Sequence, residues 1–523
     1  MSPLRMTDSA SLVADLVRAG RFPHPAERIE CIETHASWVL LAGEFAYKIK
    51  KPLDLGFLDY STPARRRAMC EEEVRLNRRT APEIYEDVVG VYGGDDAHLG
   101  AVEGAPEFAV RMRRFDQSAL FARLLAAGAL SAQHMEALAL HVADFHAQAA
   151  VARPGEGFGT AEAVIFPVRQ NFDQMRELVS DAALLECIGR LETWSAGQSQ
   201  RLSAIFDARL AGGFVRECHG DLHLANIVWL DGRALLFDGI EFNPQLRWND
   251  VVADIAFLVM DCEARGRADL ANGFLNTWLE ACGDHEGLAL LSYYVVYRAM
   301  VRAKVAAIRM HQAGGDEAAA CRDELARYLD YALARISAGR PALWIASGPS
   351  GAGKSRNGRV LVKRCGAIRI RSDVERKRLA GLKAGERAMA AVGEGLYGPE
   401  MTARTYARLQ EIVRAVVAAG RPALVDATFL KRAQRDEFRV LAAELQVPYA
   451  LLAFDAPPEV LRARVAQRAA EGLDAADADV AVLEHQLATR EAIGQDEDAL
   501  EIDTSGEVDW EAVLRRLGAG TTR

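Results

Sequence analysis

Residues 218–241, CHGDLHLANIVWLDGRALLFDGIE, constrain the fold and the chemistry of this chain more than any other stretch. A His-Gly-Asp triplet within them ends at Asp221, and Asn226 follows five residues later. Two short apolar runs on either side of an Asp-Gly pair at 231–232 predict a β-hairpin. The hairpin would return the chain to Asp238 near Asn226, so that an amide oxygen and a carboxylate could hold magnesium ions beside a second carboxylate. Phosphoryl transfer needs these parts, with one carboxylate to receive or orient the proton of an acceptor hydroxyl.

The spacing of this stretch resembles the catalytic loop of the aminoglycoside phosphotransferase-like kinases. These are distant relatives of protein kinases and have HGDxxxxN where protein kinases have HRDxxxxN. The resemblance implies that Asp221 is the catalytic base and that Asn226 and Asp238 are magnesium ligands. A structural His and Asp at a turn is the competing interpretation, which leaves Asp238 unexplained. The family's Asp-Leu-Ala segment, whose Asp braces the catalytic loop, is matched by the DIA sequence that begins at Asp254, and Asp250 is the alternative.

A predicted hairpin near the N-terminus carries the lysines of the same site. Its strands are residues 37–42 and 45–50, and Ala46, Lys48 and Lys50 share one face of the second strand because side chains alternate along a strand. Kinases place an Ala-x-Lys on such a strand, where the lysine meets the α and β phosphates. The match implies Lys48 for this role and leaves Lys50 as the alternative. Solvated lysines on an edge strand are the non-functional interpretation.

A helix over residues 63–79 follows, with a proline at its start. Glu73 lies on this helix where kinases place the glutamate that pairs with the strand lysine through charge-assisted hydrogen bonds. Glu71 and Glu72 are alternatives, because three adjacent glutamates are also typical of a solvated helix. Residues 107–115 predict a strand that would be the inter-lobe connection and would offer backbone groups to adenine.

Residues 290–312 predict a long, mostly apolar helix with one stripe of arginines, Arg298, Arg302 and Arg309. These arginines either pair with acidic residues such as Asp250 or Asp254, or line the acceptor pocket. In the second case the acceptor would be anionic or neutral, since the pockets that bind polycationic aminoglycosides need carboxylates.

A second phosphate-binding motif lies after residues 336–342, where Gly and Pro interrupt the helical pattern and predict a linker. The apolar run 342–347 leads into GPSGAGKS, which fits GxxxxGK[ST] between a strand and a helix. In such a loop backbone N–H groups cradle phosphates, the lysine reaches the β and γ phosphates, and the last hydroxyl binds magnesium. The predicted nucleotide-binding residues are Gly348, Pro349, Ser350, Gly351, Ala352, Gly353, Lys354 and Ser355. Gly358 weakens the start of the helix that follows.

Further strands with helices between them follow the loop. One strand, 368–371, leads into Asp373, another ends at Asp426, and two more are expected at 449–455 and 499–503. This alternation predicts a parallel sheet with both faces covered. Asp426 suits a carboxylate of the magnesium shell.

The second pattern resembles the small P-loop kinases related to the zeta toxins, gluconate kinase and chloramphenicol phosphotransferase. The resemblance implies that Asp373, after the second strand, receives the proton of the acceptor hydroxyl, and that Asp426 belongs to a VDAT-like strand end. A helix N-cap is the structural alternative for Asp373 and is compatible with catalysis. Lids of such kinases supply arginines that stabilise the transferred phosphoryl group. The predicted lid helix carries Arg462, Arg464 and Arg468. Of these, Arg468 is our first choice.

Composition excludes other classes of protein. The 523 residues suit about two to four domains of ~150 residues each. The net charge of -10 disfavours binding to nucleic acid through nonspecific phosphate contacts. The eight cysteines have no CxxC spacing, which favours reduced thiols over disulfides or a zinc site. No apolar run approaches the ~20 residues of a membrane span, and the N-terminus has no apolar signal core. We therefore expect a cytoplasmic protein with no membrane partner.

Together these patterns predict a multidomain chain of the α+β and α/β classes. We expect an N-terminal bilobal, protein-kinase-like fold of the aminoglycoside phosphotransferase type and a C-terminal P-loop NTPase with a parallel sheet. The predicted domains are an N-lobe at 1–118, a helical lobe with the catalytic loop at 119–335, the linker at 336–342 and a P-loop kinase domain at 343–523.

The leading functional hypothesis is a bifunctional ATP-dependent phosphotransferase with two separate sites for ATP and Mg²⁺, acting on hydroxyl groups of unidentified small molecules. One alternative is a regulatory ATP-binding protein in which one unit senses a ligand and controls the other. Another is nucleic-acid end phosphorylation by the P-loop unit, which the acidic chain and the lack of an aromatic–basic stretch disfavour.

Overall fold

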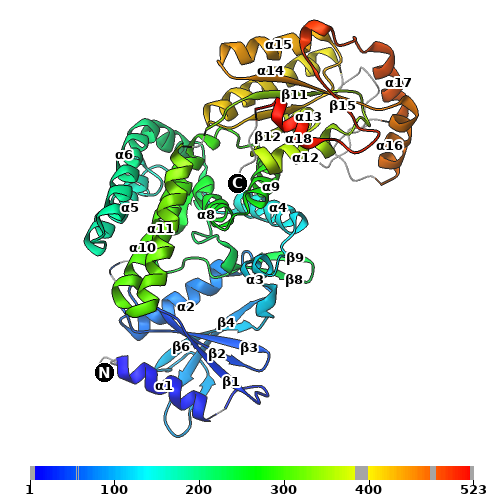
Figure 1. The fold of residues 1–523 in the computed structure, drawn as a ribbon. Coiled ribbons are helices and arrows are strands. Elements are labelled where there is room, and N and C mark those ends of the chain that lie inside the picture. Colours follow the sequence, from blue (N-terminus) through cyan, green and yellow to red (C-terminus); the bar gives the residue numbers. More distant parts are fainter. Residues whose placement is uncertain are drawn as a thin grey trace. The chain divides into compact units, whose positions relative to one another are not determined.

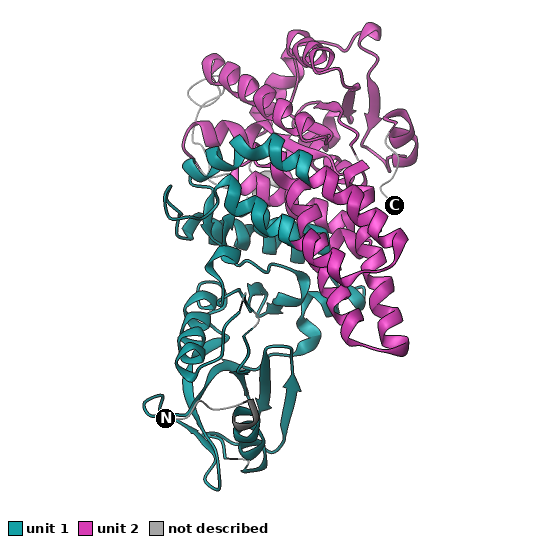
Figure 2. Ribbon diagram, turned by 90° about the vertical axis from the view of Figure 1, so that its left-hand side faces the viewer, with its two compact units in different colours: residues 1–170, 196–261 teal, residues 171–195, 262–523 magenta. Residues whose placement is uncertain are grey.

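The chain divides into two units, residues 1–170 with 196–261 and residues 171–195 with 262–523 (Figure 2). The computed structural model describes residues 6–19, 21–54, 56, 58–337, 339–382, 398–471 and 479–518, of which 6–8 and 468–471 are described by their backbone alone. Three helices run across the unit boundaries: α5 (Ala161–Leu178), α6 (Ala182–Ala211) and α8 (Val251–Ala264). The domain boundaries expected at 118, 335 and 342 stay a prediction.

Six antiparallel strands form the N-terminal sheet of the first unit, in the order β1-β2-β3-β6-β4-β5 (Figure 1). The strands are β1 (Ile29–Glu33), β2 (Ser37–Ala42), β3 (Phe45–Lys50), β4 (Tyr85–Tyr92), β5 (His98–Gly100) and β6 (Glu107–Arg113). Tyr47 and Ile49 of β3 enter the hydrophobic core beneath α1 (Met6–Ala19). Lys48 and Lys50 lie on the opposite face, toward α2 (Pro63–Asn77). The predicted β2–β3 hairpin is confirmed, with Ala42 opposite Phe45 and Ser37 opposite Lys50.

Two small sheets carry the catalytic-loop region of the first unit. Strand β7 (Val215–Glu217) pairs with β10 (Trp248–Asp250), and β8 (Ile227–Leu230) pairs with β9 (Arg233–Leu236). The residues of the β8–β9 turn, 231–232, have φ values of 49° and 77°, as in the type I′ turn that matches the twist of a two-residue hairpin. The predicted hairpin is confirmed. The other helical elements are η1 (Gln117–Ala119), α3 (Phe121–Ala126), α4 (Ala132–Gln148), η2 (Leu224–Asn226) and α7 (Pro244–Arg247).

A five-stranded parallel sheet in the order β12-β13-β11-β14-β15 dominates the second unit. Its strands are β11 (Leu343–Ser347), β12 (Ile368–Arg371), β13 (Ala423–Asp426), β14 (Tyr449–Asp455) and β15 (Leu500–Asp503). The central strand β11 is buried at every position, as expected for a parallel sheet covered on both faces. Parallel strands around a central first strand that leads into the phosphate-binding loop confirm the expected P-loop NTPase fold.

Helices cover this sheet and precede it. The helices before the sheet are α9 (Ala268–Cys282), α10 (Leu288–Gln312) and α11 (Gly315–Ser337). The helical elements that follow are α12 (Lys354–Cys365), α13 (Ser372–Leu379), α14 (Pro399–Ala418), α15 (Arg432–Glu444), α16 (Pro458–Glu471), α17 (Val480–Thr489), η4 (Gln495–Glu497) and α18 (Trp510–Arg516). Gly358 lies inside α12, where a Cβ would come within 3.2 Å of Leu424 on β13, so this glycine lets the helix pack closely on the sheet.

All eight cysteines are free thiols, as their spacing predicts. Among the helices that the structure describes, none combines the length and the apolar character needed to cross a membrane.

Candidate active sites

Glu73 of α2 contacts both lysines of β3. Its Oε1 atom lies 2.9 Å from Lys48 Nζ, and its Oε2 atom lies 2.6 Å from Lys50 Nζ. Lys48 also contacts Asp238, whose side chain is 45% exposed, whereas Lys50 is buried and contacts Glu241. The structure thus brings together the predicted Lys48, Glu73 and Asp238, and their roles stay a prediction. Lys48 is the lysine at the open side of the cluster, and Lys50 lies inside it.

Opposite charges set the protonation of this cluster. Burial acts to lower the pKa of Lys48 and of Lys50, but the nearby carboxylates outweigh it and raise the pKa of both well above the usual lysine value. Burial acts to raise the pKa of Glu73, and the two lysines outweigh it and hold that pKa below the usual range. Tyr60 donates a hydrogen bond to Glu241, and burial raises the pKa of Tyr60. The two lysines, the carboxylates of Glu73 and Glu241 and the Tyr60 phenol therefore share one network.

Helix α2 presents a polar, buried face to the same site. Asn77 lies one turn after Glu73, and both side chains are buried. The Asn77 Oδ1 atom accepts a hydrogen bond of 2.8 Å from the backbone N–H of Gly239, which holds the residue after the candidate metal ligand. Glu71 and Glu72, the alternatives to Glu73, pair with arginines instead of the β3 lysines.

Asp254 braces the catalytic loop from behind. It accepts hydrogen bonds from the backbone N–H groups of Gly220 at 2.8 Å and of His219 at 3.3 Å, and it lies 3.0 Å from His146 Nε2. Burial alone would raise the pKa of Asp254, but its hydrogen bonds and the charge of His146 lower it. Gly220 has a φ of 84°, a conformation that favours glycine between the His and the Asp of the triplet. Asp254 thus occupies the bracing position, and Asp250 does not contact these N–H groups.

Asp221 and Asn226 lie side by side in the catalytic loop. The Asn226 Nδ2 atom donates to Asp221 Oδ2 at 3.0 Å and to the Asp221 carbonyl at 3.1 Å. Because the amide nitrogen faces Asp221, the amide oxygen of Asn226 remains as a ligand atom. The half-exposed carboxylate of Asp238 adds a second oxygen ligand. Oxygen donors of this kind are those that magnesium prefers, so the residues fit the expected ion.

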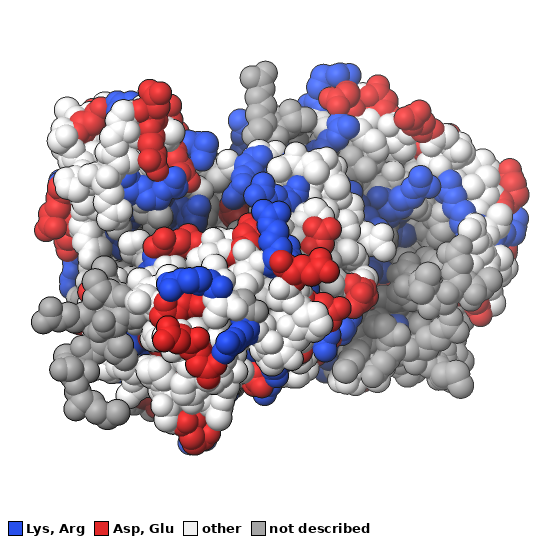
Figure 3. Space-filling view, turned by 90° about the horizontal axis from the view of Figure 1, so that it is seen from below, with Lys and Arg blue, Asp and Glu red and all other residues white. Residues whose placement is uncertain are grey.

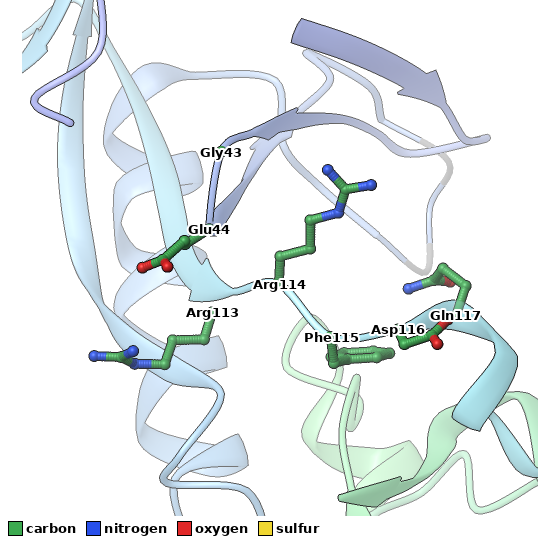
Figure 4. A pocket seen from close by; sticks show the side chains of 7 residues that line it. All are labelled: Gly43, Glu44, Arg113, Arg114, Phe115, Asp116 and Gln117. Carbon is green, nitrogen blue, oxygen red and sulfur yellow. The ribbon is translucent and has the colours of Figure 1, made fainter. Parts of the chain in front are cut away.

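A cavity of about 670 Å³ lies where β6 ends and the chain continues to η1 (Figure 4). Its lining residues are Gly43, Glu44, Arg113, Arg114, Phe115, Asp116 and Gln117. Figure 4 shows the side chains of Arg113 and Arg114 extending to opposite sides of this connection. Phe115 packs edge-on against Phe237, the residue before Asp238, with 5.2 Å between ring centroids. The cavity is therefore lined in part by the end of segment 107–115, which is expected to offer backbone groups to adenine.

The second candidate site is the segment 348–355, which leads from β11 into the first turn of α12. Its three glycines all have positive φ values: Gly348 (146°), Gly351 (82°) and Gly353 (79°). A Cβ on Gly348 would lie 2.2 Å from the carbonyl oxygen of Phe454, so a side chain does not fit there. Lys354 Nζ donates to the carbonyls of Gly348 at 2.6 Å and of Pro349 at 2.9 Å, which folds the lysine over its own loop. Six of the eight predicted residues form the connection after β11, and Lys354 and Ser355 begin α12.

Asp426, the last residue of β13, meets the end of this segment. Ser355 Oγ donates to Asp426 Oδ2 at 2.8 Å, and a hydroxyl with a carboxylate oxygen is a donor set that fits magnesium. Burial raises the pKa of Asp373, and Arg371 and Arg376 partly offset this effect. A raised pKa makes a carboxylate a stronger proton acceptor. Asp373 is not the N-cap of α13, because that helix already begins at Ser372.

The three predicted lid arginines differ in their surroundings. Arg464 of α16 donates to the carbonyls of Gly351 at 3.3 Å and of Thr504 at 2.6 Å, so it holds the P-loop from outside. Arg462 forms an exposed ion pair with α17. Arg468, our first choice, lies outside the residues whose side chains the structure describes.

The arginine stripe of α10 faces α11 at two of its positions. Arg302 and Arg309 lie 3.9 and 3.3 Å from Glu324. Asp250, one of the acidic residues considered as a partner for the stripe, is bound by Arg209 of α6. The two arginines paired with Glu324 therefore stabilise the α10–α11 packing.

Sequence reasoning missed four residues that contact these sites, Tyr60, Asn77, Glu241 and Gln486. Two of them had a signal in the sequence, because Asn77 follows Glu73 by one helical turn and Glu241 closely follows Asp238. Gln486 had none. It accepts a hydrogen bond of 2.8 Å from the backbone N–H of Ser350 and comes from α17, far along the chain.

Known proteins resemble this chain in two ways. A family model described as an AAA domain matches residues 343–493. Over 467 residues the chain is 31% identical to the uncharacterized proteins Rv2004c of Mycobacterium tuberculosis (strain ATCC 25618 / H37Rv) and Mb2027c of Mycobacterium bovis. The match covers 89% of this chain and 90% of each relative. The chain belongs to the family of these mycobacterial proteins.

Solved structures give weaker likenesses. A choline/ethanolamine kinase family protein from Mesorhizobium loti is 13% identical, with 64% of this chain and 99% of that chain covered and a TM-score of 0.38. A sugar kinase from Janibacter sp. HTCC2649 is 23% identical, with 35% and 96% covered and a TM-score of 0.26. Both TM-scores are below 0.5. The strand order of this chain itself shows two parts. The chain joins a kinase-like part with an antiparallel N-terminal sheet to a P-loop part with a parallel one.

Proposed function

We propose that this protein is an ATP-dependent phosphotransferase with two separate sites for ATP and Mg²⁺, each transferring a phosphoryl group to a hydroxyl of a small molecule. The observation that carries the proposal is the same at both places: a lysine for phosphates, a pair of oxygen ligands for a metal ion and a further carboxylate lie together. Magnesium, when bound, neutralises charge that builds up on the phosphates during transfer.

In the first site, Lys48 binds the phosphates and Glu73 fixes its position through an ion pair. Asn226 and Asp238 would hold magnesium. Asp221 accepts the proton of the acceptor hydroxyl as the new bond to phosphorus forms, and its hydrogen bond from Asn226 orients it for that step.

In the second site, the backbone of Gly348–Ser355 cradles the phosphates, and Lys354 turns from its present carbonyl partners toward them. Ser355 and Asp426 would hold magnesium. Asp373 accepts the proton of the second acceptor hydroxyl, and Arg468 is the proposed lid arginine for the transferred group.

Charge distribution supports small acceptors over nucleic acid. The chain carries a net charge of -10, and Figure 3 shows Lys and Arg side chains interspersed with Asp and Glu over the face that it presents. A nucleic-acid groove needs a continuous basic track. The eight free thiols support a reducing compartment such as the cytoplasm as the place of this chemistry.

Phosphoryl transfer from labelled Mg·ATP into a protein-free bacterial metabolite extract tests the proposal. Wild type, Asp221→Asn and Lys354→Ala are compared, and labelled products are identified by mass. Matched controls are Asp231→Asn, in the β8–β9 turn, and Lys363→Ala, exposed on α12. We expect each active-site variant to lose its own product and each control to keep both.

A product that needs both sites would indicate two consecutive transfers. Label that appears only as free phosphate or on the protein itself would contradict the proposal and favour a regulatory ATP-binding protein. Products unchanged in both active-site variants would contradict both assignments of catalytic residues.

A further inference from the structure

Helix α9 protects the edge of the parallel sheet. β12 is the first strand in the sheet order, so one of its sides has no neighbouring strand. Asn276 of α9 meets this side: its Oδ1 atom accepts from the Arg369 N–H at 2.7 Å, and its Nδ2 atom donates to the Ala367 carbonyl at 3.0 Å. One side chain thus supplies the donor and acceptor that a further strand would supply. The contact fixes the register between α9 and β12 and covers an edge that would otherwise be open to pairing.

Glu280 lies one turn further along α9, on the same side of the helix. Its Oε1 atom lies 2.9 Å from Arg371 and its Oε2 atom 3.3 Å from Arg369. The three side chains are largely buried, with 24%, 12% and 10% exposed for Glu280, Arg371 and Arg369. Arg378 also donates to the Glu280 carbonyl at 2.6 Å. The Glu280 carboxylate therefore neutralises Arg369 and Arg371, two largely buried arginines that lie two residues apart on β12.

Both arginines reach the P-loop site. Arg369 donates to the backbone carbonyl of Ser355 at 2.8 Å, which holds the residue at the proposed metal position. Arg371 is the last residue of β12, and its positive charge acts on the carboxyl of Asp373 two residues later. Glu280 thus binds the arginine that contacts the proposed metal position and also the arginine whose charge acts on the proposed base.

We propose that Glu280 is a positioning residue for phosphoryl transfer at the P-loop site. It holds Arg369 against Ser355 and binds Arg371 at the end of β12, so the site depends on a helix that precedes the whole P-loop segment in the chain. This inference rests on the proposed function of that site and adds a residue that no P-loop motif contains.

The test uses the full chain with Asp221→Asn, which removes turnover at the other site. ATP turnover is measured with Mg·ATP and the protein-free metabolite extract for Glu280→Gln, Glu280→Asp and Glu286→Gln. Glu286 is the matched control, because it is a 58% exposed glutamate that pairs with Arg408 of α14, away from Asp373. We expect Glu280→Gln to lower kcat by about tenfold or more, while KM for ATP stays within about twofold. Glu280→Asp should recover part of kcat, and Glu286→Gln should match the parent.

Three results would overturn the inference. They are an unchanged kcat in folded Glu280→Gln, an equal loss in Glu286→Gln, and a loss seen only as a higher KM. If Glu280→Gln does not fold, Glu280→Asp takes its place, and a kcat in folded Glu280→Asp equal to that of the parent also overturns the inference. Lys354→Ala in the same background separates the two proposals. Turnover that survives this change contradicts the proposed function itself, whereas turnover that it abolishes leaves only the role of Glu280 in question.

Discussion

The two candidate phosphate sites differ in the groups that form them. The first is built from charged side chains that come from β3, α2 and the segment after β9, where Glu73 holds Lys48 and Lys50. The second is built from the backbone of one continuous loop, where glycine conformations aim the N–H groups and a single lysine, Lys354, lies across its own loop. The first site is therefore a network of ion pairs that depends on tertiary packing. The second is a local structure that depends on steric fit.

This difference predicts where each site is vulnerable. A backbone cradle fails when a side chain enters it, and its charges are few. An ion-pair network tolerates small changes of shape, but it fails when one buried charge loses its partner, because an unpaired buried charge is strongly destabilising.

The largest effect is expected from Gly348→Ala. The new Cβ would lie 2.2 Å from the carbonyl oxygen of Phe454, and the φ of 146° is strained for any side chain. Strain and overpacking of this kind amount to about 3 kcal/mol, or about a hundredfold in affinity. Calorimetric titration with a non-hydrolysable ATP analogue and Mg²⁺ should find one site in the variant where wild type has two.

The matched control is Gly506→Ala, since a Cβ there meets no heavy atom within 4 Å. Both sites should persist in it. If Gly348→Ala kept two sites of normal affinity, the steric account of the second site would be wrong.

Sequence alone could predict the local structure of the second candidate site, because its determinants are contiguous. The residues 348–355, the strand before them and the helix after them all stand where the motif requires. What sequence could not supply is the set of contacts from distant segments, such as Gln486 on the Ser350 N–H or Asn276 along β12. Long-range contacts of this kind leave no periodic pattern in a single sequence.

The first site shows the same limit more strongly. The β2–β3 and β8–β9 hairpins could be predicted from alternation and an Asp-Gly turn, and both are confirmed. The choice between Lys48 and Lys50 could not be made, because alternation places both on one face and only the position of α2 and Glu241 distinguishes their surroundings. The sequence leaves Lys48 and Lys50 as alternatives for one role. In the folded chain each contacts a carboxylate of its own in addition to Glu73.

Replacing the two lysines one at a time sharpens the comparison. Lys50→Met removes the buried cation shared by Glu73 and Glu241, so we expect it to lower the free energy of unfolding by about 3 kcal/mol or more. Lys48→Met leaves Glu73 paired with Lys50, so we expect a smaller loss of stability and a loss of first-site turnover on the order of a hundredfold. Urea denaturation and product formation in the Lys354→Ala background measure the two effects. Equal losses of stability in both variants would contradict the division into an inner and an outer lysine.

The smallest effect is expected in the free energy of unfolding at acidic pH, and it concerns Glu73 of the first site. The lysines hold the pKa of Glu73 below its usual value of 4.5 against the effect of burial, so the ionised form stabilises the fold. That contribution is complete above pH 4.5, where the unfolded chain is also ionised, and it is lost progressively as the pH falls below this value toward the depressed pKa. Wild type should therefore keep its advantage in unfolding free energy over Glu73→Gln from pH 7 to pH 4.5 and lose it progressively as urea denaturation is repeated from pH 4.5 down to about pH 2. Glu71→Gln, an exposed change on the same helix, should show no such convergence with wild type. A constant difference in unfolding free energy between wild type and Glu73→Gln over this range would mean that the ion pairs around Glu73 do not hold its carboxylate ionised. That result would contradict the ion-pair network of the first site.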